Sequence, residues 1–248
     1  MNPRARESRK SRQTERATRV TAALVLAGGQ GSRLTATTND HTPKPITPVA
    51  GKPMLHWVLT MLERAGIEHA TIATGHQHEQ VRDTIEHLVT PVPTVVRRTD
   101  PDLDTAARVR AAAPAERFLL AWCDSLTRLD LPAMLETHTR ASALVTLLAV
   151  HPPSRFGHVH FDGDRVDRFE EKPAATGEWI NAGVFIVEPE AIALIPDDPT
   201  KSWERDVLPV LIDQGTLAAH RSEHPWRCLD HEHDRHALEN ALKTGLIG

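Results

Sequence analysis

The chain is organised around Leu24-Val-Leu-Ala-Gly-Gly-Gln-Gly-Ser-Arg-Leu34, an apolar run that turns abruptly into glycines. This order predicts a buried strand that ends in a loop of main-chain N–H groups. Glycine permits positive φ angles and a close approach of the backbone to an anion. Arg33 adds a fixed cation, and Lys44 follows within the rigid sequence Pro43-Lys-Pro45. Together these features indicate a phosphate-binding loop, although the glycines alone also fit an ordinary turn between a strand and a helix.

The composition is that of an ordinary globular protein. Of the 248 residues, 40% are hydrophobic and 25% are charged, and the formal net charge of −4 gives no footprint of a nucleic-acid partner. Two cysteines, Cys123 and Cys228, cannot form a disulfide framework, so we expect a reducing, cytoplasmic setting. No apolar run approaches the length that spans a bilayer, and we therefore expect no membrane partner.

Residues 1–19 differ from the rest of the chain. They hold seven basic and two acidic side chains and almost no apolar ones, so we expect a disordered basic tail. Binding of a polyanion by this tail stays open beside a merely solvated tail. Residues 20–248 show no internal repeat and no linker, and we expect them to form a single domain.

Strand-like and helix-like stretches alternate after the tail. Strands are predicted at Val20–Ala27, His69–Thr74, Thr94–Val96, Phe118–Trp122 and Ala143–Val150, with helices at 53–65, 78–88, 105–113 and 131–140 between them. This alternation predicts an α/β fold with a mostly parallel, doubly wound, Rossmann-like sheet. Ligands of such sheets bind beyond the carboxyl ends of the strands, which is where Gly28–Arg33 and Asp124 fall.

The second half predicts a small antiparallel insertion. Asp162-Gly-Asp164 separates two strand-like runs, Gly157–Phe161 and Arg165–Phe169, as in a β-hairpin. Further strands are predicted at Glu178–Val187, Thr216–His220 and Trp226–Leu229, and helices at Trp203–Gln214 and His231–Lys243.

Two carboxylates directly follow predicted strands, namely Asp124 and Asp230. Carboxylates at strand ends supply the oxygen ligands that Mg²⁺ takes beside substrate phosphates. Asp124 taken alone would equally fit a cap of the next turn. His231 and His233 lack the i, i+4 spacing of a helical zinc pair, so a solvent-facing helix start is the better interpretation of them.

Another candidate group lies around residues 171–183. Lys172 precedes a rigid proline at the end of a predicted strand and could contact a phosphate, although a surface turn is the simpler interpretation of Glu171-Lys-Pro173 in isolation. Asn181 can recognise hydroxyls as donor and acceptor. Gly183 lies inside a strand, where glycine often marks a close approach of ligand or backbone. Cys123 has no histidine at a recognisable spacing and is interpreted as packing.

The loop Leu26–Leu34 is followed by Pro43-Lys-Pro45 and Gly51-Lys-Pro-Met54. Three further motifs are Pro152-Pro-Ser-Arg-Phe-Gly157, Phe169-Glu-Glu-Lys-Pro173 and Trp179-Ile-Asn-Ala-Gly-Val-Phe185. In this order and spacing the chain resembles the sugar-1-phosphate nucleotidyltransferases, and within them the glucose-1-phosphate cytidylyltransferases. The similarity runs from about Val20 to Gly245.

The resemblance implies a nucleotide-diphospho-sugar transferase fold, a homo-oligomer and a role for each matching residue. Nucleotide contacts would come from Leu26, Ala27, Gly28, Gly29, Gly31, Ser32, Arg33 and Arg108. Arg33, Lys44 and Lys172 would neutralise phosphates in catalysis, and Glu171, Lys172, Asn181 and Gly183 would hold the sugar phosphate. Asp124 and Asp230 would bind Mg²⁺.

The chain departs from the family pattern at two places. Ala106 and Ala107 stand where glycines are usual, and we expect their methyl groups to narrow or reshape the pocket. Cys123 and Ser125 replace the usual glycines on either side of Asp124. The implied reaction transfers a nucleoside monophosphate from a triphosphate, with CTP favoured, to a sugar 1-phosphate, with glucose 1-phosphate favoured. The alternatives are an uncommon sugar or cyclitol phosphate with another triphosphate, and a non-catalytic binding protein.

Overall fold

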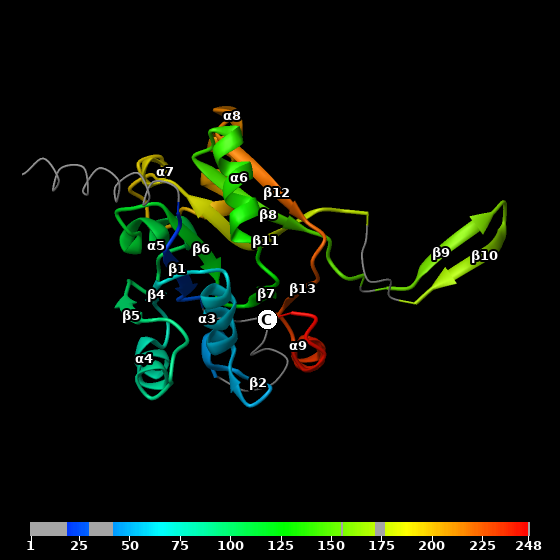
Figure 1. Ribbon diagram of the computed structural model, residues 1–248, viewed down its shortest axis with the longest axis horizontal. Coiled ribbons are helices and arrows are strands. Elements are labelled where there is room, and N and C mark those ends of the chain that lie inside the picture. Colours follow the sequence, from blue (N-terminus) through cyan, green and yellow to red (C-terminus); the bar gives the residue numbers. More distant parts are fainter. Residues whose placement is uncertain (1–18, 30–41, 155, 172–176, 248) are drawn as a thin grey trace, which may run out of the picture.

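A seven-stranded sheet forms the centre of the computed structural model, which describes residues 19–29, 42–154, 156–171 and 177–247 (Figure 1). In spatial order its strands are β12 (Leu217–Ser222), β8 (Val145–Val150), β11 (Ile180–Val187), β6 (Phe118–Trp122), β1 (Ala22–Ala27), β4 (His69–Thr74) and β5 (Thr94–Arg98). β11 is antiparallel to both of its neighbours, and the other pairings in this sheet are parallel. The predicted mostly parallel α/β fold is confirmed.

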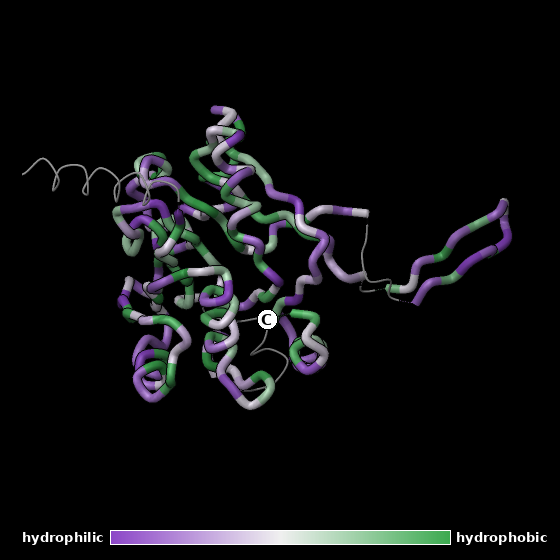
Figure 2. Tube along the Cα trace, viewed as in Figure 1, coloured by the Kyte–Doolittle hydropathy of each residue, from purple (hydrophilic) through white to green (hydrophobic). Residues whose placement is uncertain are grey.

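Helices cover both faces of the sheet because both faces of its strands are apolar. All six residues of β1 are buried; Ala23 and Val25 face one core, and Leu24 and Leu26 face the other. The first core is closed by α3 (Met54–Arg64), α4 (His78–Glu86), α6 (Leu131–Ala141) and α9 (Glu232–Lys243), and the second by α5 (Thr105–Ala112), α7 (Pro189–Ile192) and α8 (Leu208–Asp213). Figure 2 shows hydrophobic residues along the central strands between these layers.

The order of the strands places a crevice beside β1. The chain proceeds from β1 to β4 and β5 on one side, and then returns to pair β6 on the other side of β1. The three parallel strands β1, β4 and β6 therefore end at one edge, followed by Gly28, Gly75 and Cys123 respectively. Ligands of open α/β sheets bind at such a reversal of strand order.

A two-stranded hairpin projects from the body of the molecule (Figure 1). It consists of β9 (His158–Asp162) and β10 (Arg165–Glu170), which are antiparallel as predicted from Asp162-Gly-Asp164. Gly163 takes a positive φ of 58° in the turn. The register, with an irregularity after Val166, places four exposed apolar side chains on one face. They are Val159, Phe161, Val166 and Phe169.

The helix predicted over 203–214 is divided. Its first part is a π-helix, η2 (Trp203–Val207), in which Leu208 N–H donates to the carbonyl of Trp203, and α8 follows. Pro209 has no N–H to give to the carbonyl of Arg205 and its ring disfavours a continuous α-turn there, which accounts for the wide turn.

Several short elements were not predicted. They are the 3₁₀ helix η1 (Lys44–Ile46), β2 (Pro48–Val49), β3 (Lys52–Pro53) and β7 (Ser125–Thr127), which pairs with β13 (Trp226–Cys228). Residues 1–18 of the predicted tail lie outside the described residues. Within the described ranges, no helix is long and apolar enough to cross a bilayer.

Candidate active site

Lys44 lies between two carboxylates at the sheet edge. Its Nζ is 3.1 Å from Oδ2 of Asp124 and 2.6 Å from Oδ1 of Asp230. Pro43 and Pro45 restrict the backbone on both sides, and the N–H groups of Ile46 and Thr47 donate to the carbonyl of Pro43 to close the η1 turn. The lysine side chain therefore starts from a fixed turn.

Asp124 and Asp230 meet because two distant segments pair. Asp124 follows β6, and Leu229 N–H donates to its carbonyl at 2.8 Å. Cys228 of β13 pairs with Ser125 of β7 on the other side. Asp230 lies between β13 and α9. The sequence predicted a strand before this residue and a helix after it, but not that it would meet Asp124.

The site is mostly buried and strongly charged. The Lys44 side chain is only 11% exposed. Burial alone disfavours its ammonium, but Asp124 and Asp230 outweigh burial, so the pKa of Lys44 is raised above its usual value. Lys44 is therefore charged at neutral pH. Two carboxylates and one ammonium leave a net charge of −1, which favours a further cation.

The donor set at this point fits a hard divalent ion. Oxygens of Asp124 and Asp230 both converge on one cationic atom, the Nζ of Lys44. Mg²⁺ is held in phosphate-transfer sites by one or two carboxylates together with substrate oxygens and water, rather than by a full protein cage. No group of three His, Cys, Asp or Glu side chains suited to a metal occurs among the described residues. His231 and His233 stack on each other instead, and the Asp234 carboxylate accepts from the N–H groups of Asp230 and His231 at the start of α9.

A cavity of about 300 Å³ opens beside these charges. It is lined by Leu26, Ala27, Gly28, Gly29, Lys44, Pro45, Leu103, Asp104, Thr105, Arg108, Trp122, Cys123 and Asp124. The structure thus brings Lys44 together with the described part of the glycine loop and Asp124, the two groups expected here from their places at strand ends. Gly31, Ser32, Arg33 and Lys172 lie outside the described residues.

Arg108 lies beneath this cavity. The side chain is 4% exposed, and its guanidinium donates to the carbonyls of Thr74, Asp100, Pro101 and Leu103 and to the hydroxyl of Thr99. A Cβ on Gly28 or on Gly75 would overlap the guanidinium. A side chain at position 28 would therefore displace the Arg108 guanidinium from these bonds. These bonds hold the 99–103 loop, and Arg108 also lines the cavity, so its predicted contact with a nucleotide stays a prediction.

The alanines at 106 and 107 do not narrow the cavity. Ala106 is fully buried in the core between α5 and β1, and neither alanine lines the cavity. Their N–H groups donate to the carbonyl of Lys201, which fastens the first turn of α5. The expectation that their methyl groups narrow this cavity is wrong, because Ala106 packs in the helix–sheet core and Ala107 lines a different cavity beside Leu103 and Arg110.

The residues around Asp124 have separate tasks. Ser125 Oγ donates to Oδ1 of Asp124 at 3.2 Å and so orients the carboxylate. Burial, followed by the charge of Asp124, raises the pKa of the Cys123 thiol to about 12. Cys123 is therefore a neutral thiol at physiological pH and packs in the hydrophobic core, as the sequence suggested.

Asn181 and Gly183 form a layer behind the cavity wall. The Asn181 side-chain oxygen accepts from Gly183 N–H at 2.9 Å, at a register irregularity of β11. Gly183 has φ +77°, and a Cβ there would lie 3.2 Å from Cβ of Trp122, whose side chain lines the cavity. Glu171 lies beside Gly157 at the base of the hairpin. None of Glu171, Asn181 and Gly183 is among the described residues that line the cavity.

The sequence interpretation missed two lining residues, Leu103 and Asp104. Asp104 precedes the predicted helix 105–113 and is its N-cap, accepting from Thr105 N–H. Asp104 could have been found as the N-cap candidate before the predicted helix. A helix that starts at this edge of the sheet turns its amino end toward the ligand crevice.

Residues 22–227 match the model of the nucleotidyl transferase family. The chain belongs to this family. It is a sugar-phosphate nucleotidyltransferase, whose substrates are a nucleoside triphosphate and a sugar phosphate.

Relatives of this nucleotidyltransferase differ in base and sugar. Glucose-1-phosphate cytidylyltransferase of Salmonella typhi is 31% identical over 90% of this chain and 96% of its own length. The catalytic subunit beta of mannose-1-phosphate guanylyltransferase of Danio rerio is 30% identical over 82% of this chain and 59% of its own. Among solved structures, HddC from Yersinia pseudotuberculosis complexed with GMP-PN matches with a TM-score of 0.70 at 21% identity, covering 90% of this chain and 100% of that one.

Proposed function

We propose that the protein transfers cytidylate from CTP to glucose 1-phosphate and releases pyrophosphate. The observation that carries the chemistry is the convergence of Asp124, Asp230 and Lys44 at the carboxyl ends of the central strands. The choice of CTP and glucose 1-phosphate is supported by the cytidylyltransferases, which align along nearly their whole length.

The reaction joins two anions. An oxygen of the sugar phosphate attacks the α-phosphorus of the triphosphate, the new P–O bond forms, and the bond to the bridging oxygen breaks so that pyrophosphate leaves. The attacking oxygen is already an anion, and no nucleophilic side chain or general base is needed. Catalysis then depends on positioning and on neutralising charge.

Lys44 is the described cation best placed for this task, because it lies at the edge of the cavity and is charged. In the proposal Arg33 and Lys172 add to it, and Gly31 and Ser32 extend the loop of Leu26–Gly29 around the nucleotide. Glu171, Asn181 and Gly183 remain proposed determinants of the sugar-phosphate half.

Asp124 and Asp230 are the residues that would hold Mg²⁺. When bound, the ion would stabilise the negative charge that develops on the phosphate oxygens. Lys44 compensates only one of the two carboxylate charges, and the second is costly in a mostly buried position unless a further cation binds. The retention of both carboxylates therefore supports an enzyme over a non-catalytic binding protein.

The proposal includes a homo-oligomer. An isolated two-stranded hairpin is only marginally stable in water, yet β9 and β10 project with Val159, Phe161, Val166 and Phe169 exposed on one face. Exposed apolar patches of this kind mark interaction surfaces. A second copy of the chain would cover this face.

The test is a panel of four ribonucleoside triphosphates and dTTP against several sugar 1-phosphates and a cyclitol phosphate, read by pyrophosphate release with Mg²⁺. Turnover that is fastest with CTP and glucose 1-phosphate is the expected result. Fastest turnover with an uncommon sugar or cyclitol phosphate would replace the acceptor while keeping the chemistry. Nucleotide binding with no pyrophosphate from any pair would leave a binding protein in place of the enzyme.

A further inference from the structure

We propose that Asp104 and Arg205 form the edge of the nucleotide pocket that recognises the base, and that they select cytosine over uracil and thymine. This inference rests on the proposed function, since it concerns the nucleotide half of the same site. It assigns a specificity role to two residues that lie 101 positions apart in sequence but are joined by an ion pair of 2.8 Å.

The position of the pair follows from the cavities. A second cavity of about 510 Å³ adjoins the first, and both are lined by Gly28, Gly29 and Asp104. Arg205 lines the second cavity, whereas Lys44 and Asp124 line only the first. When the phosphates of a nucleotide lie at Lys44, its base therefore extends past the two glycines toward Asp104 and Arg205.

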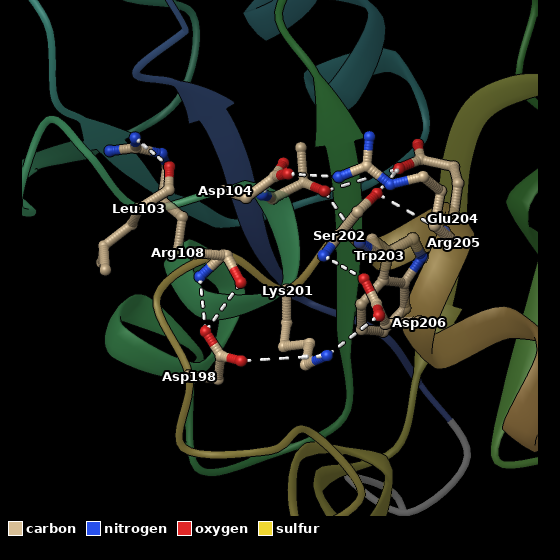
Figure 3. Close-up of polar contacts among 12 residues, drawn as sticks. Leu103, Asp104, Arg108, Asp198, Lys201, Ser202, Trp203, Glu204, Arg205 and Asp206 are labelled. Carbon is tan, nitrogen blue, oxygen red and sulfur yellow. Dashed lines mark hydrogen bonds and ion pairs between the residues drawn. The ribbon is translucent and has the colours of Figure 1, made fainter.

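The pair carries both acceptors and donors, and Figure 3 shows the contact between its two side chains. Oδ1 of Asp104 accepts from Thr105 N–H at 2.6 Å, and Oδ2 accepts from Nη2 of Arg205 at 2.8 Å. A carboxylate has about four lone-pair sites, so these two bonds do not exhaust it. The Arg205 side chain is 72% exposed, and its guanidinium carries five N–H donors in a fixed plane.

The two residues are held in place by bonds on both of their segments. Asp104 N–H donates to the carbonyl of Pro199 at 2.8 Å, and Trp203 N–H donates to the hydroxyl of Thr105 at 2.8 Å. Ser202 N–H donates to Asp206 at 2.8 Å within the same turn. These hydrogen bonds fix the π-helix that carries Arg205 against the amino end of α5, as Figure 3 shows. Such preorganisation lowers the entropic cost of recognition.

The chemistry of this edge matches cytosine. Cytosine offers an amino donor at N4 beside acceptors at N3 and O2, and carboxylates accept from this amino group in base recognition. Asp104 would accept from N4–H while Arg205 donates to N3 or O2. Uracil and thymine place the O4 acceptor where cytosine has its amino group, so in the same orientation O4 would face the Asp104 carboxylate, and only a shift of the ring would let Asp104 accept from N3–H instead.

The experiment measures binding of CTP and UTP by calorimetry, with Mg²⁺, to the full chain and to the variants Asp104→Asn and Arg205→Gln. Asparagine is also a good N-cap, so α5 keeps its cap, and thermal unfolding verifies this. Matched controls are Asp197→Asn and Arg110→Gln. These residues form a comparable exposed pair at 2.6 Å, and neither lines the two cavities that contain Asp104.

We expect the wild type to bind CTP roughly 10- to 100-fold more tightly than UTP, the range that one good side-chain–base contact provides. Asp104→Asn should cut this ratio about tenfold, because its amide can donate to O4 of uracil. Arg205→Gln should weaken CTP binding, and both controls should leave the ratio unchanged.

Three results would overturn the proposal: an unchanged ratio in Asp104→Asn, a wild type that binds UTP or dTTP as tightly as CTP, or tightest binding of GTP. The binding assay does not need turnover. A CTP preference that depends on Asp104, found without pyrophosphate release from any substrate pair, would therefore refute the proposed transfer reaction and support the base assignment.

Discussion

Lys44→Met removes the ammonium that joins Asp124 to Asp230 while keeping a side chain of similar length. Breaking a buried ion pair by removing one partner costs about 3–5 kcal/mol, whereas exposed pairs are worth about 0.2–1 kcal/mol. The three side chains are 11%, 22% and 17% exposed, which is close to the buried case but open to some water. We therefore expect the free energy of unfolding to fall by about 2–4 kcal/mol.

The assay is thermal and chemical unfolding of the variant with and without Mg²⁺. For a domain of this size, 1 kcal/mol lowers Tm by about 2–4 °C, so the metal-free variant should unfold about 4–16 °C earlier. Mg²⁺ should raise Tm more in Lys44→Met than in the wild type, because the ammonium no longer competes for the two carboxylates. Bound at about 100 times its Kd, the ion would restore about 2.7 kcal/mol.

Lys201→Met is the matched control. Lys201 also lies between two aspartates, with Nζ 3.2 Å from Asp206 and 3.8 Å from Asp198, but the group is more exposed and lies outside the cavity beside β1. It should lose less stability and gain nothing from Mg²⁺. If Lys44→Met were as stable as the wild type in the absence of metal, the ion pairs could not be what holds Asp124 and Asp230 together.

Three further predictions concern other parts of the molecule. Asp124→Asn should lower Mg²⁺-dependent pyrophosphate release at least about 100-fold with an unchanged circular dichroism spectrum, while Asp130→Asn, which keeps a helix cap, should be active; full activity of Asp124→Asn would contradict the metal assignment. His138→Gln should flatten the pH dependence of unfolding measured in denaturant between pH 5 and 8. Burial lowers the pKa of His138 in the folded state, so this residue's contribution is complete above the unfolded value near 6.5 and is lost as pH falls below it; equal slopes would exclude this. Phe161→Asp should reduce the molecular mass in sedimentation, unlike Val89→Asp at an exposed position outside the hairpin; an unchanged mass would remove the hairpin from the interface.

The sheet and the first half of the site were predictable because they depend on local patterns. β1, β4 and β6 are short apolar runs that end at glycine or at a polar residue, and parallel strands bring such ends to one edge. Lys44 between two prolines and Asp124 after a strand could therefore be identified as candidate site residues from local sequence alone. Asp124 and Asp230 reach the same ammonium because β7 pairs with β13. Strands of three residues are too short for such a pairing to be predicted from the sequence.

Contacts between distant segments could not be predicted. The ion pair of Asp104 with Arg205 needs the π-helix, whose wide turn arises from a proline six residues after Trp203. Asn181 shows a second kind of contact that the sequence did not reveal, because its side-chain oxygen accepts a local bond from Gly183 N–H. A polar side chain near a strand irregularity is often used by the backbone itself.

Arg108 explains how the altered segment 105–108 can still serve a nucleotide pocket. Alanine favours a helix over glycine by about 0.8–1.0 kcal/mol per residue, so Ala106 and Ala107 stabilise the first turn of α5. That turn directs Arg108 under Gly28 and Gly75, where its bonds to four carbonyls hold the loop that ends at Asp104. A flexible glycine pair would leave this loop less fixed. The alanines therefore stabilise the helix start that follows Asp104, the residue that we propose to recognise the base.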